Sequence, residues 1–170
     1  MTETSPQRLS VQIRRVAKQD LKKIMAMLDA MIRSGMSDVD AGWLKTGDAS
    51  ALVQYRLEKQ LGLIALNGSD AVGFMSWKLG IAQPPYRAVR YSQIDGLWVN
   101  ERSRRQGLAR ALWAQYLQEC SRQAIRDIRI SVPASATSLP FFAGLGFVHT
   151  ESLLTYRGSR DASGLNLMDD

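Results

Sequence analysis

Cysteine and histidine are nearly absent from this sequence of 170 residues, which contains one of each, Cys120 and His149. A single cysteine cannot form an intrachain disulfide, and so few thiol and imidazole groups exclude a zinc site of the usual ligand composition. We therefore expect neither a disulfide framework nor a bound metal. His149 has no paired Ser or Cys motif, so we expect it at the surface or satisfied by neighbouring groups rather than in catalysis.

Long apolar runs are missing as well. The longest, such as residues 61–66, fall far short of the ~18 to 20 residues that a membrane-spanning helix needs. Residues 1–10 are polar and lack the apolar stretch and the small-residue cleavage site of a secretory signal. The sequence therefore predicts a cytoplasmic protein without a membrane segment.

The composition that is present fits one globular domain. Hydrophobic residues make up 45% of the chain and charged residues 22%, which is enough apolar content for a core. Residues 1–10 and 158–170 have the polar, aperiodic composition of flexible tails, so we place the folded domain at residues 11–157. The net charge of +6 favours an anionic partner such as a nucleic acid, a phosphate-bearing cofactor or an acidic surface.

The pattern of apolar residues predicts the first half of the fold. Alternation indicates strands, and recurrence every three or four residues indicates helices. We expect a strand at 11–16, a helix between Asp20 and Gly35, a loop at 35–48, a second helix at 50–61, and strands at 61–66 and 71–79. Asn67 and Gly68 form the turn signal that pairs the last two strands antiparallel.

In the second half, the isolated Gly96 inside a strand-like run predicts a β-bulge. We expect a strand at 87–99, a helix at 106–122, a strand at 128–132, a short helix at 138–145, and one or two strands within 147–156. This order predicts an α/β fold with a single mixed, mostly antiparallel sheet flanked by helices and containing one strand-helix-strand crossover.

The segment from Ile94 to Arg110 passes from a strand through a loop into a helix and carries the clearest chemical signal. The first amides of a helix have no intrahelical acceptor, and Gly107 lets the oxygens of an anion approach the backbone closely. Four arginines are crowded into this loop and helix start, at 102, 104, 105 and 110. The segment has neither the Gly-Lys-Ser/Thr ending of a Walker loop nor the first glycine of a dinucleotide fingerprint. It predicts a phosphate or pyrophosphate site.

With Arg104, Gly107 and Ala109 at the defining positions, residues 94–112 resemble the fourth strand, pyrophosphate loop and third helix of the GNAT superfamily of acetyl-CoA-dependent N-acetyltransferases. Residues 138–147 are similar to the family's aromatic helix end, in the right order and at the right separation. The resemblance covers about residues 11–156. It implies a GNAT-like sheet that is splayed between the fourth and fifth strands.

The resemblance also implies where acetyl-CoA binds. Its pantetheine arm would pair with the backbone of Leu97, Trp98 and Val99 as a pseudo-strand in the splay. Ser135 and Phe142 would lie beside the cofactor. The pyrophosphate would lie at the helix start, on Arg104 and on the amides of Arg105, Gln106, Gly107, Leu108, Ala109 and Arg110.

Two of these positions depart from the family pattern. Phe142 stands where the family often has a tyrosine that protonates the leaving thiolate, and Ser135 stands where an asparagine is common. Asp95 matches an acidic position that some members use as a base, although a solvated or salt-bridged strand residue explains it equally well. Weaker candidates for the base are Tyr91, Ser92 and Tyr156. Cys120 lies about 20 Å along the helix from Gly107, so we expect it to be a packed thiol rather than a nucleophile.

We therefore predict an N-acetyltransferase that moves an acetyl group from acetyl-CoA to a primary amine of a small molecule or peptide by direct attack in a ternary complex. The alternative, which Phe142 favours, is a non-catalytic CoA-binding domain with a regulatory or scaffolding role. Nucleic acid is a weaker partner because the arginines cluster at one loop without interleaved aromatics. The sequence does not decide whether the protein forms a homodimer. Four aspartates gather near the expected acceptor side, Asp29, Asp38, Asp40 and Asp48. They are explained either by the binding of a cationic acceptor or by a solvated acidic loop without such a role.

Overall fold

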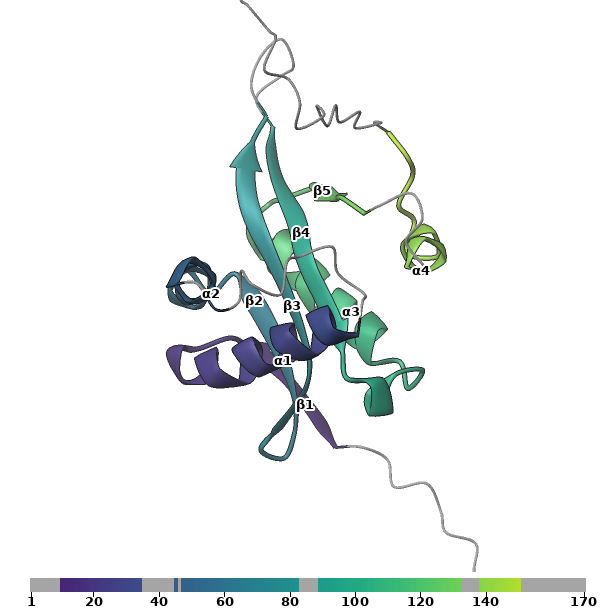
Figure 1. Cartoon of the computed structure of the whole chain (residues 1–170). Coiled ribbons are helices and arrows are strands. Elements are labelled where there is room, and N and C mark those ends of the chain that lie inside the picture. Colours follow the sequence, from purple (N-terminus) through teal and green to yellow (C-terminus); the bar gives the residue numbers. More distant parts are fainter. Residues whose placement is uncertain (1–9, 35–44, 46, 83–88, 133–137, 151–170) are drawn as a thin grey trace, which may run out of the picture. The chain divides into compact units, whose positions relative to one another are not determined.

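The computed structural model describes residues 10–34, 45, 47–82, 89–132 and 138–150, and the chain divides into two compact units, residues 1–131 and 132–170. The first unit contains β1 (Val11–Arg15), the 3-10 helix η1 (Lys18–Asp20), α1 (Leu21–Arg33), α2 (Gly47–Glu58), β2 (Gly62–Asn67), β3 (Asp70–Ile81), β4 (Arg90–Val99), the 3-10 helix η3 (Glu101–Ser103), α3 (Leu108–Arg122) and β5 (Asp127–Ile130) (Figure 1). The second unit contains α4 (Leu139–Ala143).

The five strands form one sheet in the order β1-β2-β3-β4-β5. The first four pair antiparallel, whereas β5 pairs parallel to β4 after the crossover through α3. The predicted mixed, mostly antiparallel sheet with one crossover is therefore confirmed. Among the described helices, none is long and apolar enough to cross a membrane.

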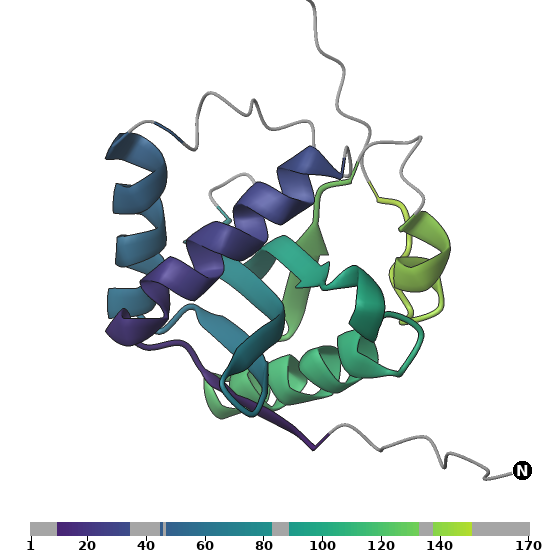
Figure 2. The same ribbon diagram turned by 60° about the horizontal axis from the view of Figure 1, so that its bottom comes forward.

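Helices cover both faces of this sheet. On one face, Met27 of α1 packs with Phe74 and Trp98 of the central strands. On the other face, the Tyr116 ring of α3 lies 5.0 Å from the ring of Trp77, between centroids. Figure 2 shows α1 and α3 on either side of the strands. The sheet thus has an α1/α2 face and an α3 face, and the faces have different roles in the site.

The structure corrects the predicted start and end of the second helix. The loop was predicted to reach residue 48, but α2 begins at Gly47 because Ala49 is fully buried and continues the apolar spacing of Val53 and Leu57. The helix stops at Glu58 rather than residue 61, since Gln60 has a left-handed φ of 53°. Residues 35–44 and 46 of the predicted loop lie outside the described residues.

The last predicted strands are also corrected in part. Residues 147–150 form no strand, while residues 151–156 lie outside the described part of the chain. The short helix α4 is confirmed, with Pro140 in its first turn, where a missing N–H costs nothing. Both predicted tails, residues 1–10 and 158–170, fall almost entirely outside the described residues.

Candidate active site

A β-bulge in the middle of β4 sets the geometry of the site. Ser76 of β3 pairs with Gly96, but the next residue, Trp77, pairs with Ile94, so Asp95 is the extra residue. The bulge predicted from Gly96 is therefore present. Because side chains alternate along a strand, one extra residue reverses which face the following side chains occupy.

Asp95 follows Ile94 in ordinary alternation and so lies on the α1/α2 face, and the bulge places Gly96 and Trp98 on that face as well. Before the bulge, Ser92 accepts a hydrogen bond from Tyr116 of α3. After the bulge, Trp98 packs against Met27 of α1. The carboxylate therefore lies at the middle of a central strand, on the face to which the bulge also turns the residues that follow it.

The partner strand of β4 ends at the same point. The β4–β5 ladder runs from Tyr91 paired with Asp127 to Ile94 paired with Ile130 (Figure 1). From Asp95 to Val99, the β5-side edge of β4 has no strand neighbour among the described residues. Backbone amides and carbonyls on such an edge need hydrogen-bond partners, and the predicted pantetheine segment, residues 97–99, lies along it. The Trp98 side chain is packed in the core.

Beyond this edge, the chain enters α3 through a loop with two left-handed residues. Arg105 has a φ of 60°, and Gly107, which precedes the first helical residue, has a φ of 80°. The helix begins at Leu108, two residues later than predicted, and no acidic side chain lies in its first turn. Its first amides are therefore directed out of the helix without a capping carboxylate, which suits an anion.

The four arginines of this loop do not act alike. Arg102, Arg105 and Arg110 are exposed around the helix start. Arg104, by contrast, donates from Nε to the carbonyl oxygen of Val99 at 3.1 Å, and its guanidinium lies 4.7 Å from the centroid of the Trp98 ring. Arg104 thus fastens the loop to the end of β4, a structural contact that a sequence motif does not reveal.

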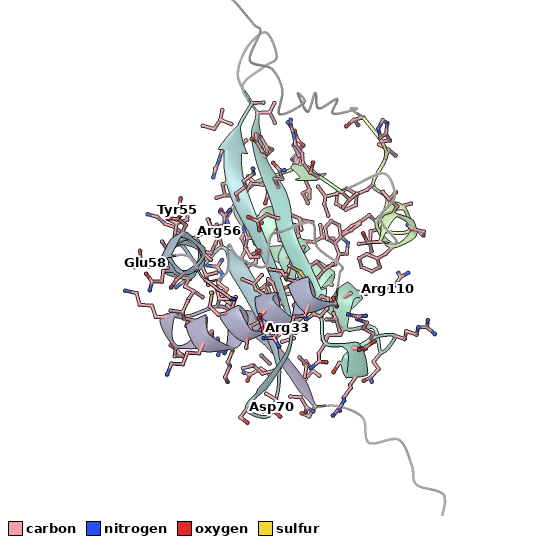
Figure 3. The ribbon with its side chains drawn as sticks, in the orientation of Figure 1. Arg33, Tyr55, Arg56, Glu58, Asp70 and Arg110 are labelled. Atoms are coloured by element: carbon pink, nitrogen blue, oxygen red, sulfur yellow. The ribbon has the colours of Figure 1, made fainter. Side chains whose placement is uncertain are left out.

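The Asp95 carboxylate is held at both oxygens. Ser76 Oγ donates to Oδ1 at 2.6 Å, and Arg56 Nη2 donates to Oδ2 at 2.5 Å. The side chains of Arg56 and Asp95 are 16% and 28% exposed, so water reaches the carboxylate. A Cβ on Gly96 would lie 2.9 Å from Ser76 Oγ, so the glycine leaves room for this hydroxyl. Figure 3 shows Arg56 on α2 beside the sheet.

Sequence reasoning missed Arg56 and Ser76. Arg56 lies 39 positions before Asp95, and only the packing of α2 brings the two together. The one local signal of these contacts was the position of Ser76, which lies on the partner strand opposite the predicted bulge. The sequence left open that Asp95 is a salt-bridged strand residue, and the structure supplies Arg56 as its partner in an ion pair. The carboxylate nevertheless stays partly exposed.

The other described candidates for the base are less accessible than Asp95. Ser92 is fully buried under Tyr116, and the Tyr91 ring lies under the Arg129 guanidinium, 4.3 Å from it. Tyr156 lies outside the described residues. Cys120 is buried, as expected of a packed thiol, and burial raises the pKa of that thiol. Asp95 is therefore the best-placed base candidate among the described residues.

The second unit contains the remaining predicted contact that can be described. Phe142 is buried, with its ring edge-on to Phe141 and Phe147 at centroid distances of 5.2 Å and 5.7 Å. Its surroundings in this unit are aromatic, which fits a phenylalanine. Ser135 lies outside the described residues, and His149 is exposed.

A groove of about 650 Å³ also opens between α1 and the ends of β3 and β4. Trp98 and Arg104 line it, together with Met27 and Asp70, whereas Asp95 does not. This groove is therefore separate from the carboxylate at the bulge.

Comparisons with known proteins identify the family. A family model described as an acetyltransferase (GNAT) domain matches residues 40–162, which is more than half of the chain. A comparison with curated proteins finds no match.

Solved structures share the fold at low sequence identity. A GCN5-related N-acetyltransferase from Ralstonia eutropha JMP134 has a TM-score of 0.70 at 19% identity, covering 87% of this chain and 99% of that chain. A predicted acetyltransferase from Clostridium acetobutylicum, solved with acetyl-CoA, has a TM-score of 0.73 at 15% identity, covering 86% and 96%. AAC(6')-Iy, in complex with the bisubstrate analogue CoA-S-monomethyl-acetylneamine, has a TM-score of 0.68 at 19% identity, covering 88% and 98%. With the family model matched and the expected five-stranded mixed sheet present, the chain belongs to the GNAT acetyltransferase family.

Proposed function

We propose that this protein transfers an acetyl group from acetyl-CoA to a primary amine of a small molecule or peptide by direct attack in a ternary complex. The observation that carries the proposal is the continuous path from the bulge to the α3 start. Along this path the unpaired edge of β4 at residues 95–99 leads to a helix N-terminus that has no acidic residue in its first turn.

The donor set on this path fits acetyl-CoA. The backbone of Leu97, Trp98 and Val99, which β5 does not pair, would bond the amides of pantetheine as a pseudo-strand, beside the hydrogen bond that the Val99 carbonyl already accepts from Arg104. The amides from Arg105 to Arg110 would hold the pyrophosphate, with the exposed arginines adding charge-assisted contacts. Ser135 and Phe142 stay proposed cofactor contacts from the second unit. When bound, acetyl-CoA supplies the acetyl group as an activated thioester.

Asp95 would act as the base. An amine attacks the thioester only when its nitrogen lone pair is free, so an ammonium must first lose a proton. Each carboxylate oxygen offers about two acceptor sites, and Ser76 and Arg56 occupy one on each oxygen. The others remain to accept that proton, directly or through a water molecule.

Phe142 has no hydroxyl to protonate the departing sulfur. A thiol with a pKa near ~8.5 can leave as the thiolate and take its proton from water, so transfer proceeds without a phenol. Acetyl transfer is therefore compatible with phenylalanine at this position, at a modest rate.

The acceptor class follows less directly. The bisubstrate analogue bound to AAC(6')-Iy joins CoA to acetylneamine, and such an amine belongs in the first panel tested. Asp29 is already paired with Arg33 at 2.7 Å, which weakens the case that it recruits a cationic acceptor. Asp38 and Asp40 lie outside the described residues.

The experiment that tests the proposal measures CoA release and the acetylated product across a panel of aminoglycosides, polyamines, amino acids and peptides. We expect slow but protein-dependent turnover with at least one amine. Phe142→Tyr keeps the ring and should raise turnover if the phenol reaches the sulfur, and because Phe142 is buried, thermal denaturation first establishes that the variant is folded. If wild type binds acetyl-CoA and acetylates nothing while Phe142→Tyr turns over, the wild-type protein is the non-catalytic CoA-binding domain instead.

A further inference from the structure

We propose that Arg56 is a positioning residue for acyl transfer and that it acts through Asp95. This inference rests on the proposed function, in which Asp95 is the base. Arg56 would not touch the acceptor or acetyl-CoA. Its role would be to fix the direction in which the carboxylate presents its remaining acceptor sites.

The first step of the argument is that two separate elements hold the carboxylate. Ser76 of β3 holds Oδ1, and Arg56 of α2 holds Oδ2. The Asp95 side chain is 28% exposed, so packing alone leaves its carboxylate some freedom to rotate. Two charge-assisted hydrogen bonds from opposite sides remove that freedom.

The second step is that Arg56 is itself held firmly. Val53 and Leu57, on the same helix, are buried in the core, and this packing fixes the face that α2 turns to the sheet. The carbonyl oxygen of Arg56 accepts a hydrogen bond from the Leu61 amide at 2.9 Å, which closes the end of the helix. Figure 3 shows Arg56 on the sheet side of α2, with Tyr55 and Glu58 directed away.

The third step concerns charge. The Arg56 guanidinium balances the negative charge of Asp95, so the carboxylate attracts a cationic acceptor less than an unpaired one would. Losing Arg56 therefore misplaces the base without removing a binding contact for either substrate. The effect should fall on kcat, with KM for acetyl-CoA unchanged.

The test begins with Arg56→Gln, which keeps a polar side chain but removes the charged fork. We expect kcat to fall at least about tenfold with KM for acetyl-CoA unchanged, because small errors in the position of a catalytic group are costly. Arg56→Lys, which restores a cation, should recover part of the loss. A kcat that stays at the wild-type level or rises in Arg56→Gln would overturn the proposal.

A double-mutant cycle separates positioning from general support of the fold. In an Asp95→Asn background, Arg56→Gln should lower kcat no further, because the group through which it acts is already gone. If instead the two losses multiply, Arg56 acts independently of Asp95 and the proposal is wrong. Arg33→Gln is the matched control, since Arg33 forms an exposed ion pair with Asp29 on α1, and its kcat should match wild type.

Amide hydrogen exchange tests whether the Arg56–Asp95 ion pair holds the bulge, and this measurement does not depend on turnover. Arg56→Gln should speed exchange at Asp95 and Gly96, whereas Arg33→Gln should not. Unchanged exchange at the bulge would contradict the positioning role whatever the activity. If wild type binds acetyl-CoA but acetylates no amine, the proposed function fails and Arg56's catalytic role fails with it, while exchange still reports whether the ion pair holds the bulge.

Discussion

Single residues set the two ends of the proposed site. At one end, Gly107 adopts a left-handed φ of 80° and opens the start of α3 toward a ligand. At the other, Asp95 is the extra residue of the β4 bulge and lies on the α1/α2 face, where Ser76 and Arg56 hold it. One position concerns binding and the other concerns chemistry, so substitutions at the two should have different kinetic signatures.

Gly107→Glu should weaken CoA binding by an order of magnitude or more, a loss of at least about 1.4 kcal/mol. The substitution places bulk and negative charge where the pyrophosphate is proposed to lie. Gly68→Glu is a matched control, because Gly68 also has a left-handed φ, 60°, and open space around its Cβ position, but lies at the β2–β3 turn. Calorimetry on both folded variants checks the prediction, and equal CoA affinities would refute the site.

Asp95→Asn should lower turnover far more than it weakens acetyl-CoA binding, because a positioned base contributes about 10²- to 10⁴-fold to the chemical step. Asp127→Asn, which alters another aspartate–arginine pair of the sheet, should retain activity. Wild-type turnover in Asp95→Asn would leave Asp95 as a salt-bridged strand residue only.

At the scale of elements, two ion pairs join the edge strand β1 to both helical layers. Arg14 donates to Asp20, at the entrance of α1, while its neighbour Arg15 donates to Glu119 of α3. Successive side chains of a strand point to opposite faces, so adjacent arginines reach opposite layers. Both carboxylates are almost fully buried, and hydrogen bonds from the arginines lower the pKa of each below its ordinary value.

These pairs predict acid sensitivity. A carboxyl whose pKa is lowered by folding contributes stability at pH values above its unfolded pKa, and this contribution is lost as pH falls through the folded pKa. The ordinary values are 3.8 for Asp20 and 4.5 for Glu119. The free energy of unfolding should therefore be steady from neutral pH to about 5.5 and should decline below that, as denaturant titrations at each pH would show.

Asp20→Asn should destabilise the fold by about 2 kcal/mol at neutral pH and flatten part of this acid decline. Asp29→Asn breaks an exposed i,i+4 pair with Arg33 and should cost no more than about 0.5 kcal/mol. Chemical denaturation of both variants measures the difference. Equal stability losses would show that the burial of Asp20 does not matter.

Local patterns predicted the elements better than their contacts. Gly96 indicated the bulge because an isolated glycine in a strand is a local signal, and the Asn67-Gly68 turn indicated the antiparallel pairing. The start of α2 was missed because Gly47 and Asp48 are typical of loops, whereas the burial of Ala49 depends on tertiary packing.

The site was predictable to the extent that it lies in one continuous segment. The strand, loop and helix from Ile94 to Arg110 are contiguous, so their motif can be recognised in the sequence. The partner of Asp95 comes from α2, and the contact of Arg104 with Val99 depends on how the loop folds back. No local pattern encodes either contact.

At the scale of the whole molecule, we propose direct transfer rather than a covalent acetyl-enzyme. Cys120, the chain's only cysteine, is buried, and burial raises the pKa of its thiol, so it does not supply an accessible thiolate. Ser92 is fully buried in a hydrogen bond with Tyr116. Direct transfer requires both substrates to be bound together when the acetyl group moves.

Initial rates of CoA release, with acetyl-CoA and the best amine of the panel varied together, test this claim most directly. Double-reciprocal plots should give lines that intersect, as expected of a ternary complex. Parallel lines, which indicate a ping-pong reaction through an acetyl-enzyme, would contradict direct attack. Absence of protein-dependent turnover with every amine, in a protein that binds acetyl-CoA, would contradict the assignment of acetyl transfer itself.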